Sequence, residues 1–196
     1  MLFYDGEAER YLQLCRDNAV HTLATSYIFE MRAETLKKRL LWVNYVGLAV
    51  PILVGTLVLS FDIDSWNTIK IIAGAILVPQ ILINLFSLVG GWVNDLPYAN
   101  TSAAANDSLS MRFDSLATAP PESPVELKQA IEKLAIEDKA RRDQDTAQNI
   151  KGTEKRMGMR YALRKFGRSC AGCDLIPKSM KPTDCDVCGN FKYSDR

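Results

Sequence analysis

Four of the five cysteines lie near the end of this 196-residue sequence, where they form two CxxC pairs. Cys170 and Cys173 make the first pair, eleven residues follow, and Cys185 and Cys188 make the second pair. Each pair can wrap one side of a metal ion, and four thiolates at about 2.3 Å complete the tetrahedral shell of zinc. The spacing therefore predicts a four-cysteine zinc knuckle within residues 169–196.

Two other chemistries fit the same cysteines. A rubredoxin-like iron site also uses four thiolates, but no motif for a redox partner is visible, so zinc is favoured. A redox-active dithiol is the second alternative. Four protein ligands close a zinc site, and a closed site is structural rather than catalytic. Gly189 directly follows the second pair, which predicts a left-handed turn that directs backbone N–H groups at sulfur.

Two apolar stretches occupy the middle of the chain. Residues 40–61 and 71–93 contain no charged side chain over 22 and 23 residues, respectively. About 20 helical residues cross a bilayer core of roughly 30 Å, and a helix satisfies its own backbone polar groups in lipid. We therefore expect a transmembrane hairpin of two antiparallel helices, linked by residues 62–70. A buried helical hairpin in a soluble protein is the alternative.

The charges around the hairpin predict its orientation. Cytoplasmic segments of membrane proteins carry an excess of Lys and Arg. Basic residues precede the first span and follow the second, and those before the first span are Arg32, Lys37, Lys38 and Arg39. The linker is mostly acidic, with Asp62, Asp64 and Lys70. Both termini are therefore expected in the cytoplasm, with two spans in the inner membrane. A reducing cytoplasm also disfavours disulfides and favours metal binding by the cysteines.

Polar residues of the second span share one face. Gln80, Asn84, Ser87 and Gly91 are separated by four, three and four positions. Polar side chains are costly in hydrocarbon, so this face should meet protein or water. The first span offers a single amide, Asn44, so one hairpin is expected to leave Gln80 and Asn84 mostly unpaired. Two interpretations stay open: hydrogen bonds that hold the hairpin or a homo-oligomer together, or a stripe that lines a pore.

The first span has its own pattern. Gly47, Pro51 and Gly55 recur every four residues, and small residues at this spacing let helices approach closely. Pro51 lacks an N–H group, so it leaves one carbonyl of the preceding turn free and favours a kink.

The remaining segments are predicted to be helical. Apolar residues at steps of three and four predict a long amphipathic helix over residues 7–39, packed on other helices or on the membrane surface. Three further helices are predicted over residues 102–117, 124–148 and 154–166. A capping box from Ser123 to Glu126 is expected to begin the second of these.

The fold class predicted from these elements is an all-α membrane protein. It has a two-helix transmembrane hairpin, cytoplasmic helices and a small C-terminal four-cysteine zinc knuckle. The predicted regions are an N-terminal cytoplasmic helix (1–39), the hairpin (40–93), a cytoplasmic helical region (94–168) and the zinc-binding tail (169–196).

No pattern in the sequence indicates catalysis. There is no Gly-rich phosphate loop and no Ser-His-Asp set, and His21 is the only histidine. His21 is expected at the surface or in a packing contact, and Cys15 as a small buried side chain. Residues 154–168 carry six basic residues and one acidic residue, Glu154, which favours either nucleic-acid binding or a solvated surface.

Together these features resemble the mobilome CxxCx(11)CxxC proteins, two-span membrane proteins similar to the SLATT group. The resemblance extends over nearly the whole chain, and its most specific parts are the cysteine spacing with residues 189–191, the stretch 159–164, and Gln144 with Asp145. It implies a place in mobile and defence gene neighbourhoods of prokaryotes. SLATT-type proteins are proposed membrane effectors that form pores after a nucleotide second messenger or another sensor triggers them. Of the family's residues, the four cysteines carry over as metal ligands.

Two functions are expected from the sequence. The first is a membrane effector that assembles as a homo-oligomer in the lipid bilayer and perturbs or perforates it on a signal from a sensor protein or a nucleotide. The alternative is a membrane-tethered adaptor whose basic helix and zinc knuckle bind nucleic acid or a protein partner.

Overall fold

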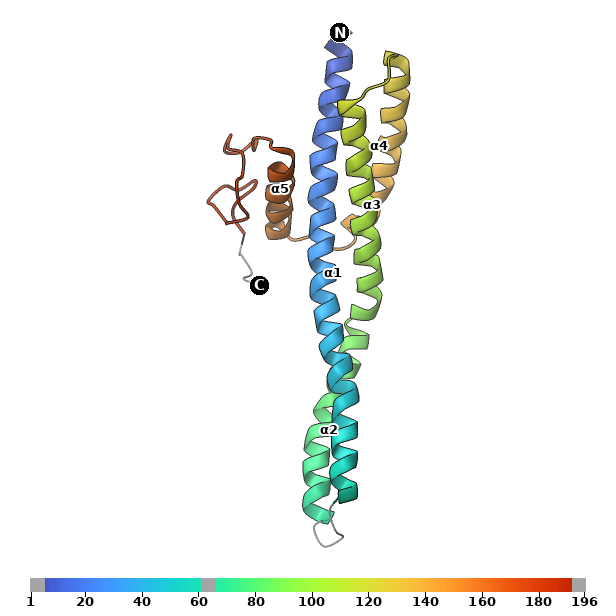
Figure 1. The fold of residues 1–196 in the computed structure, drawn as a ribbon, viewed down its shortest axis with the longest axis vertical. Coiled ribbons are helices and arrows are strands. Elements are labelled where there is room, and N and C mark those ends of the chain that lie inside the picture. The colour runs from blue at the N-terminus through green and yellow to red at the C-terminus, as the bar shows by residue number, and fades with distance from the viewer. Residues whose placement is uncertain (1–5, 61–65, 192–196) are drawn as a thin grey trace. The chain divides into compact units, whose positions relative to one another are not determined.

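The computed structural model describes residues 6–60 and 66–191, and residues 1–5, 61–65 and 192–196 lie outside the described part. The described residues form five helices and no strand, which confirms the all-α prediction (Figure 1). They are α1 (Gly6–Ser60), α2 (Trp66–Val89), α3 (Trp92–Thr118), α4 (Pro124–Thr146) and α5 (Gly152–Phe166). The chain divides into two compact units. We call Met1–Met31 with Asn100–Arg196 the helical unit, and Arg32–Ala99 the hairpin unit.

α1 is one continuous helix that contributes residues to both units. No Gly or Pro occurs between Gly6 and Gly47, so nothing in this stretch interrupts the backbone hydrogen bonds. The apolar stripe predicted from the sequence is buried at Leu12, Cys15, Ala19, Val20, Leu23, Ala24 and Ile28. In the helical unit this stripe packs on other helices, which is one of the two surroundings that the sequence allowed.

The larger core of the helical unit joins α1, α3 and α4. Each helix supplies three residues at helical spacing, and Phe113 and Leu127 are completely buried. The members are Leu12, Cys15, Ala19, Leu109, Phe113, Ala117, Leu127, Ile131 and Leu134. Complete burial of a leucine or phenylalanine side chain contributes about 1.5–3 kcal/mol. The narrow apolar face of α4 is therefore sufficient, because it meets equally narrow faces on two neighbours.

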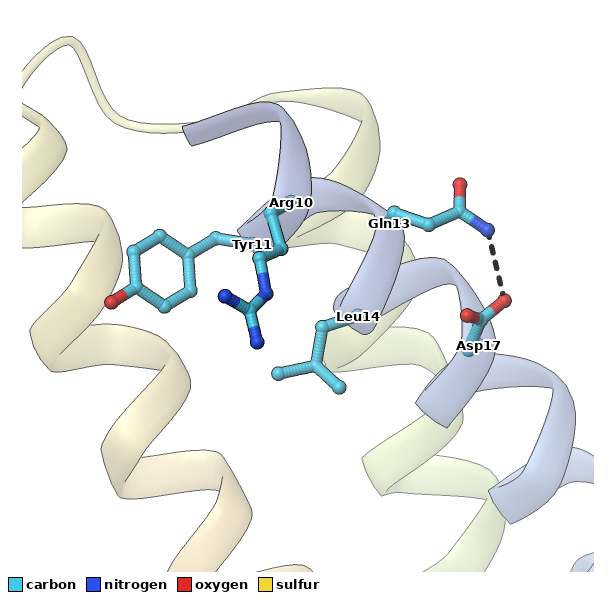
Figure 2. A pocket seen from close by; sticks show the side chains of 5 residues that line it. All are labelled: Arg10, Tyr11, Gln13, Leu14 and Asp17. Carbon is cyan, nitrogen blue, oxygen red and sulfur yellow. Dashed lines mark hydrogen bonds between the residues drawn. The ribbon is translucent and has the colours of Figure 1, made fainter. Parts of the chain in front are cut away.

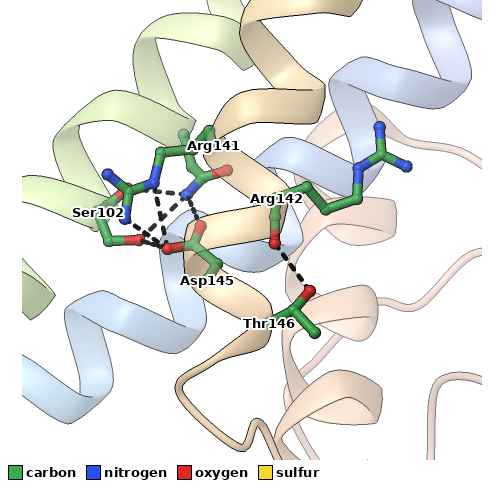
Figure 3. A network of polar contacts seen from close by, with 6 residues as sticks. Ser102, Arg141, Arg142, Asp145 and Thr146 are labelled. Carbon is green, nitrogen blue, oxygen red and sulfur yellow. Dashed lines mark hydrogen bonds and ion pairs between the residues drawn. The ribbon is translucent and has the colours of Figure 1, made fainter.

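A buried polar network joins α3 to α4 (Figure 3). The carboxylate of Asp145 is 2 % exposed and accepts hydrogen bonds from Ser102 Oγ at 2.7 Å and Asn106 Nδ2 at 2.8 Å. Arg141, one turn earlier on α4, forms an ion pair with the same carboxylate at 2.6 Å. A buried charge is tolerated when it is paired and hydrogen-bonded, and Asp145 meets both conditions. The network therefore fixes the register of α3 on α4.

Two serine hydroxyls fasten α1 to α3. Ser110 Oγ of α3 donates to the carbonyl of Ala19 at 2.8 Å, and Ser26 Oγ of α1 donates to the carbonyl of Ala103 at 2.9 Å. The two bonds run in opposite directions between the helices. They hold the backbones close at two levels, where larger side chains would separate them.

The predicted ends of α3 and α4 are only partly correct. α3 begins at Trp92, ten residues before the predicted start at residue 102. α4 begins at Pro124 as predicted, but the Ser123 side chain makes no capping hydrogen bond, so the predicted capping box is wrong. Pro124 has no N–H group to be capped and its fixed φ suits the first helical position, so the helix begins without that bond.

α5 packs closely on α1. Gly158 explains how: a Cβ atom there would lie 2.4 Å from the carbonyl oxygen of Ala24, so only glycine permits this approach. Beside this contact the rings of Tyr27 and Tyr161 stack at 4.0 Å between centroids. Gly167, with φ 62°, then ends the helix in the left-handed conformation that glycine adopts without strain. The glycine inside the predicted helix therefore serves packing rather than termination.

The hairpin unit has its apolar side chains on the outside. By length and composition, α1 and α2 are long and apolar enough to cross a membrane. Leu82, Phe86 and Leu88 of α2 are 60–65 % exposed, whereas Gln80 and Ser87 of the same helix are buried. Exposed apolar side chains in such density are unusual on a protein surface that meets water.

α2 ends earlier than the predicted second span. It stops at Val89, and Gly91 adopts φ 73° before α3 begins at Trp92. The predicted single span over residues 71–93 is therefore wrong at its end, because the two glycines permit a turn there. Of the predicted linker, residues 62–65 lie outside the described residues, and residues from Trp66 onward already belong to α2.

Candidate metal centre

The two CxxC pairs meet in the segment after α5. Their four Sγ atoms lie within 4.8 Å of one another. Sulfur-to-sulfur distances are 3.8 Å between Cys170 and Cys185 and 3.9 Å between Cys173 and Cys188. Around a tetrahedral ion with bonds of about 2.3 Å, ligand atoms lie about 3.8 Å apart. The four sulfurs therefore have the spacing of ligands to one metal ion, as the sequence predicts.

Both pairs fold in the same way. The N–H group of the second intervening residue points at the first sulfur of its pair, from Gly172 to Cys170 and from Val187 to Cys185, both at 3.4 Å. The residue after each pair, Asp174 or Gly189, donates its N–H to the carbonyl of the first cysteine at 2.8 Å. This repeated turn points two thiols toward a common centre, and donors to sulfur stabilise the thiolate form.

The reason for Gly189 differs from the one that the sequence suggested. Its φ is not positive, so the predicted left-handed turn at Gly189 is wrong; after the first pair it is Asp174 that adopts a positive φ, 54°. Gly189 is needed for space instead. A Cβ atom there would lie 2.0 Å from Thr183 Oγ1 and 2.6 Å from the Thr183 carbonyl oxygen. The loop between the pairs therefore crosses directly against this glycine.

The electrostatic surroundings of the sulfurs differ. Hydrogen bonds from the N–H groups of Cys188 and Val187 lower the pKa of the Cys185 thiol to about 7. Burial raises the pKa of Cys188, which is 1 % exposed. A bound cation acts in the opposite direction, since metal coordination deprotonates a thiol outright. The buried side of the centre therefore depends most on a cation to hold thiolates.

The cysteines are also part of the hydrophobic core. Cys170 and Cys188 are 0 % and 1 % exposed. They pack with residues of α1 and α5, namely Val20, Leu23, Ala24, Ala162 and Leu163. We call residues 169–191 the cysteine knuckle. It is joined to the N-terminal helix through this core, a contact between distant parts of the sequence that spacing alone did not predict.

Two arginines of α5 hold the knuckle. Arg160 Nε donates to the Ser179 carbonyl at 2.7 Å, and its Nη1 lies 3.3 Å from the carbonyl and 3.9 Å from the sulfur of Cys188. Arg156 donates to the carbonyls of Asp186 and Asn190 at 2.9 and 3.0 Å. In the sequence both arginines belong to the basic segment 154–168. Arg160 also lies in the distinctive stretch 159–164, which was the signal available for it, whereas nothing in the sequence distinguished Arg156.

The donor set fits a closed, thiolate-bound metal. Four sulfurs at tetrahedral spacing suit zinc or iron, whereas calcium and magnesium prefer oxygen. All four positions of such a shell are filled by the protein, which leaves none for water or substrate. Bound there, the ion would supply a cross-link between the two turns and no catalytic step.

The polar stripe of the hairpin unit faces the other helix of the hairpin. Gln80 Nε2 donates to the Gly47 carbonyl at 3.0 Å, so the expectation that one hairpin leaves Gln80 mostly unpaired is wrong for its amide nitrogen. Pro51 explains the contact: the residue four positions after Gly47 normally donates to its carbonyl, and proline has no N–H. Asn84 lies beside Gly47, and Ser87 is 3 % exposed. Gln80 Oε1 is buried and has no hydrogen-bond partner in the described part of the chain.

A pocket lies on the outer face of α1 (Figure 2). It is lined by Arg10, Tyr11, Gln13, Leu14 and Asp17. In Figure 2, Arg10, Tyr11 and Leu14 point to one side, whereas Gln13 donates to Asp17 at 3.1 Å on the other. Asp17 also pairs with Arg168 at 2.8 Å. The Asp17 carboxylate of this pocket is therefore already paired, and the lining residues contain no nucleophile beside a base.

The two residues singled out as structural have the predicted surroundings. Cys15 is 0 % exposed, and burial raises the pKa of its thiol to about 11, so the thiol stays protonated and unreactive near neutral pH. His21 lies on the exposed side of α1.

Comparison with known proteins gives one assignment. No curated protein and no solved structure matches the chain. The family model described as "Mobilome CxxCx(11)CxxC protein" matches residues 12–191, and this range includes all five helices in whole or in part and both cysteine pairs. The chain belongs to the mobilome CxxCx(11)CxxC protein family.

Proposed function

We propose that this protein is an effector of the prokaryotic inner membrane. The hairpin unit spans the bilayer with both termini in the cytoplasm, and copies assemble and perturb or perforate the membrane when the helical unit receives a signal. That signal comes from a sensor protein or a nucleotide of a mobile-element or defence system. The observation that carries the proposal is the distribution of side chains in the hairpin unit, where apolar residues are exposed and polar residues are buried. Leu82 is 60 % exposed, whereas Gln80 is 7 % exposed.

Aromatic and basic residues support the membrane position. The Arg39 guanidinium lies 5.4 Å from the centre of the Trp92 ring, and Phe86 packs edge-on against the same ring at 5.6 Å. Trp at the headgroup level, beside Arg, is typical of the end of a transmembrane helix. The contact brings the end of the basic cluster and the end of the second span to one interface, which supports cytoplasmic termini.

The buried stripe supports an assembly step. The Gln80 amide donates one hydrogen bond to the Gly47 carbonyl. Its Oε1 is a buried acceptor that has no donor in the described part of the chain. In hydrocarbon an unsatisfied acceptor is costly, so a donor from another copy or from water is favoured. Opening of the hairpin toward neighbouring copies would give the stripe such partners and a polar path through the membrane.

Membrane potential tests this function directly. The chain is expressed with its neighbouring genes, and depolarisation is followed with a voltage-sensitive dye. Gln80→Leu with Asn84→Leu should keep the protein in the membrane and abolish depolarisation. Ile81→Leu with Leu85→Ile, on side chains exposed in the hairpin, is the matched control and should leave depolarisation unchanged. Depolarisation by the Gln80/Asn84 variant at the wild-type level would contradict the proposal.

Zinc is the metal that we propose for the cysteine knuckle. Four thiolates at tetrahedral spacing without a redox partner favour zinc over iron. The ion has a structural and not a catalytic role, because the four sulfurs leave no open position. Elemental analysis of the purified, reduced protein should give one zinc and no iron per chain. Iron at the same stoichiometry, or no metal, would overturn the assignment.

The alternative adaptor function has less support, because several basic residues of segment 154–168 already have partners within the protein. Arg156 and Arg160 are directed at the knuckle and Arg168 pairs with Asp17. Three exposed basic side chains of α5 remain, Lys155, Arg164 and Lys165. Nucleic-acid binding that falls steeply with salt and is lost on reversing these three charges would favour the adaptor over the effector.

A further inference from the structure

Arg160 is a buried cation without a carboxylate partner in the described part of the chain. Its side chain belongs to a residue that is 7 % exposed, and its hydrogen bonds go to the Ser179 and Cys188 carbonyls, the Thr183 hydroxyl and the Cys188 sulfur. Arg141, whose side chain is 12 % exposed, has Asp145 as its counter-charge. A buried charge without an opposite charge is strongly unfavourable. Arg160 therefore needs a negative partner that backbone carbonyls supply only in part.

The metal centre provides that partner when it is loaded. Four thiolates carry four negative charges, and a divalent ion leaves a net charge of about −2 on the centre. Cys188, the cysteine nearest to Arg160, is 1 % exposed, so water cannot screen that charge on its side. Opposite charges attract most strongly where the local dielectric is low. The loaded centre and the guanidinium thus neutralise each other at a buried contact.

Arg156 offers a natural comparison on the same helix. It lies one turn before Arg160 and also donates to knuckle carbonyls, those of Asp186 and Asn190. It has no contact with sulfur, and it is more exposed than Arg160. Both arginines therefore attach α5 to the knuckle, but only Arg160 reaches a cysteine sulfur, that of Cys188.

We propose that Arg160 is the counter-cation of the metal centre: it stabilises the thiolate-bound metal and thereby couples metal occupancy to the docking of α5. The proposal rests on the metal site described under Proposed function. It makes Arg160 a positioning residue, which acts on the metal through Cys188. Loss of the metal leaves the buried guanidinium without its partner, so the α5–knuckle contact should weaken in the same step.

The test uses the full chain in detergent, loaded with Zn²⁺ or with Co²⁺ as a coloured substitute. Arg160→Met should lower the metal affinity by about 10–100-fold, as loss of an outer-shell partner of a metal ligand does, and zinc should therefore pass to a chelator faster. It should also move the sulfur-to-cobalt charge-transfer band to longer wavelength, because the thiolate loses a hydrogen-bond donor. Arg156→Met, the matched control, should change the rate by less than about threefold and leave the band in place.

Each outcome decides the proposal. Equal release rates and unshifted bands in Arg160→Met and Arg156→Met would overturn it, since both arginines would then act only through carbonyls. If Arg160→Met does not fold, Arg160→Lys and Arg156→Lys give the same comparison, with faster release expected only for the former. A wild-type chain that takes up neither metal would instead overturn the metal assignment itself, independently of Arg160.

Discussion

The two units of this protein are built in opposite ways. In the helical unit Phe113 and Leu127 are fully buried, and the buried side chains of Ser102, Asn106 and Asp145 hydrogen-bond to one another. In the hairpin unit the large apolar side chains are exposed and Gln80 and Ser87 are buried. With the hairpin unit in lipid, as proposed above, one physical rule covers both units: each exposes the groups that its solvent accepts.

The difference supports the membrane position proposed for the hairpin unit. A surface of Leu, Ile and Phe would draw hairpins together in water, whereas in a bilayer it contacts lipid at no cost. Conversely, hydrogen bonds between side-chain amides of two helices contribute little in water, where water competes for the same groups, and form specific helix–helix contacts in hydrocarbon. The contrast leads to predictions for each unit, and to one in which the same substitution is costly in one unit and tolerated in the other.

The largest effect is expected where metal and core coincide. Cys188→Ser removes a ligand and a buried side chain of the core around Val20 and Ala24, so it should abolish metal binding and unfold the cysteine knuckle. The hairpin should remain inserted, because the burial of its helices in lipid does not depend on the knuckle. Cys15→Ser, equally buried but outside the centre, should keep the metal. Metal analysis measures the metal content of the two variants, and hydrogen exchange measures the folding of the knuckle. Stoichiometric metal in Cys188→Ser would refute Cys188 as a metal ligand.

The buried charge of the helical unit should have the next largest effect. Asp145→Asn leaves Arg141, whose side chain is 12 % exposed, without its charge partner, and we expect a loss of about 3–5 kcal/mol. The exposed pair of Arg112 and Glu137 is the control, and Glu137→Gln should change stability little because water solvates both groups. Chemical denaturation of the two variants compares them. Similar midpoints would show that the network of Figure 3 adds no stability.

A matched lysine pair compares the two solvents. Leu82 of the hairpin unit and Met111 of the helical unit are 60 % and 63 % exposed. Leu82→Lys should impair membrane insertion by about 2.5–3.5 kcal/mol, since lysine is costly in the middle of a bilayer. Met111→Lys should change neither insertion nor folding. Membrane fractionation reads out both, and equal tolerance of the two lysines would end the transmembrane interpretation.

The smallest effect concerns two residues linked through one carbonyl. Gln80→Leu should cost about 0.6–2 kcal/mol, because it leaves the Gly47 carbonyl without a donor. In a Pro51→Ala background the cost should shrink, since the new N–H at position 51 donates to that same carbonyl. A double-mutant cycle on hairpin stability measures the coupling. Equal costs in both backgrounds would show that the carbonyl does not connect Pro51 with Gln80.

The sequence predicted features that depend on local spacing. The start of α4 at Pro124, the clustering of the cysteines and the apolar spans follow from periodicity, turn chemistry and ligand count. The contacts of Gln80 and Arg160 did not follow, because they depend on which helix faces which. Gly189 shows a third case, in which the residue was noticed but its reason, the approach of Thr183, lies in the tertiary fold.

The discontinuous make-up of the helical unit has a consequence for synthesis on the ribosome. Its first part, Met1–Met31, is made early, and its second part, Asn100–Arg196, is made last. At about 5–20 residues per second, the interval between Ile28 and Cys188 lasts roughly 8–32 s. During that time the apolar stripe of α1 has no partner, whereas the hairpin already has both of its helices. Nascent chains should therefore engage the insertion machinery before the water-facing core closes, with chaperones covering the N-terminal stripe in the meantime.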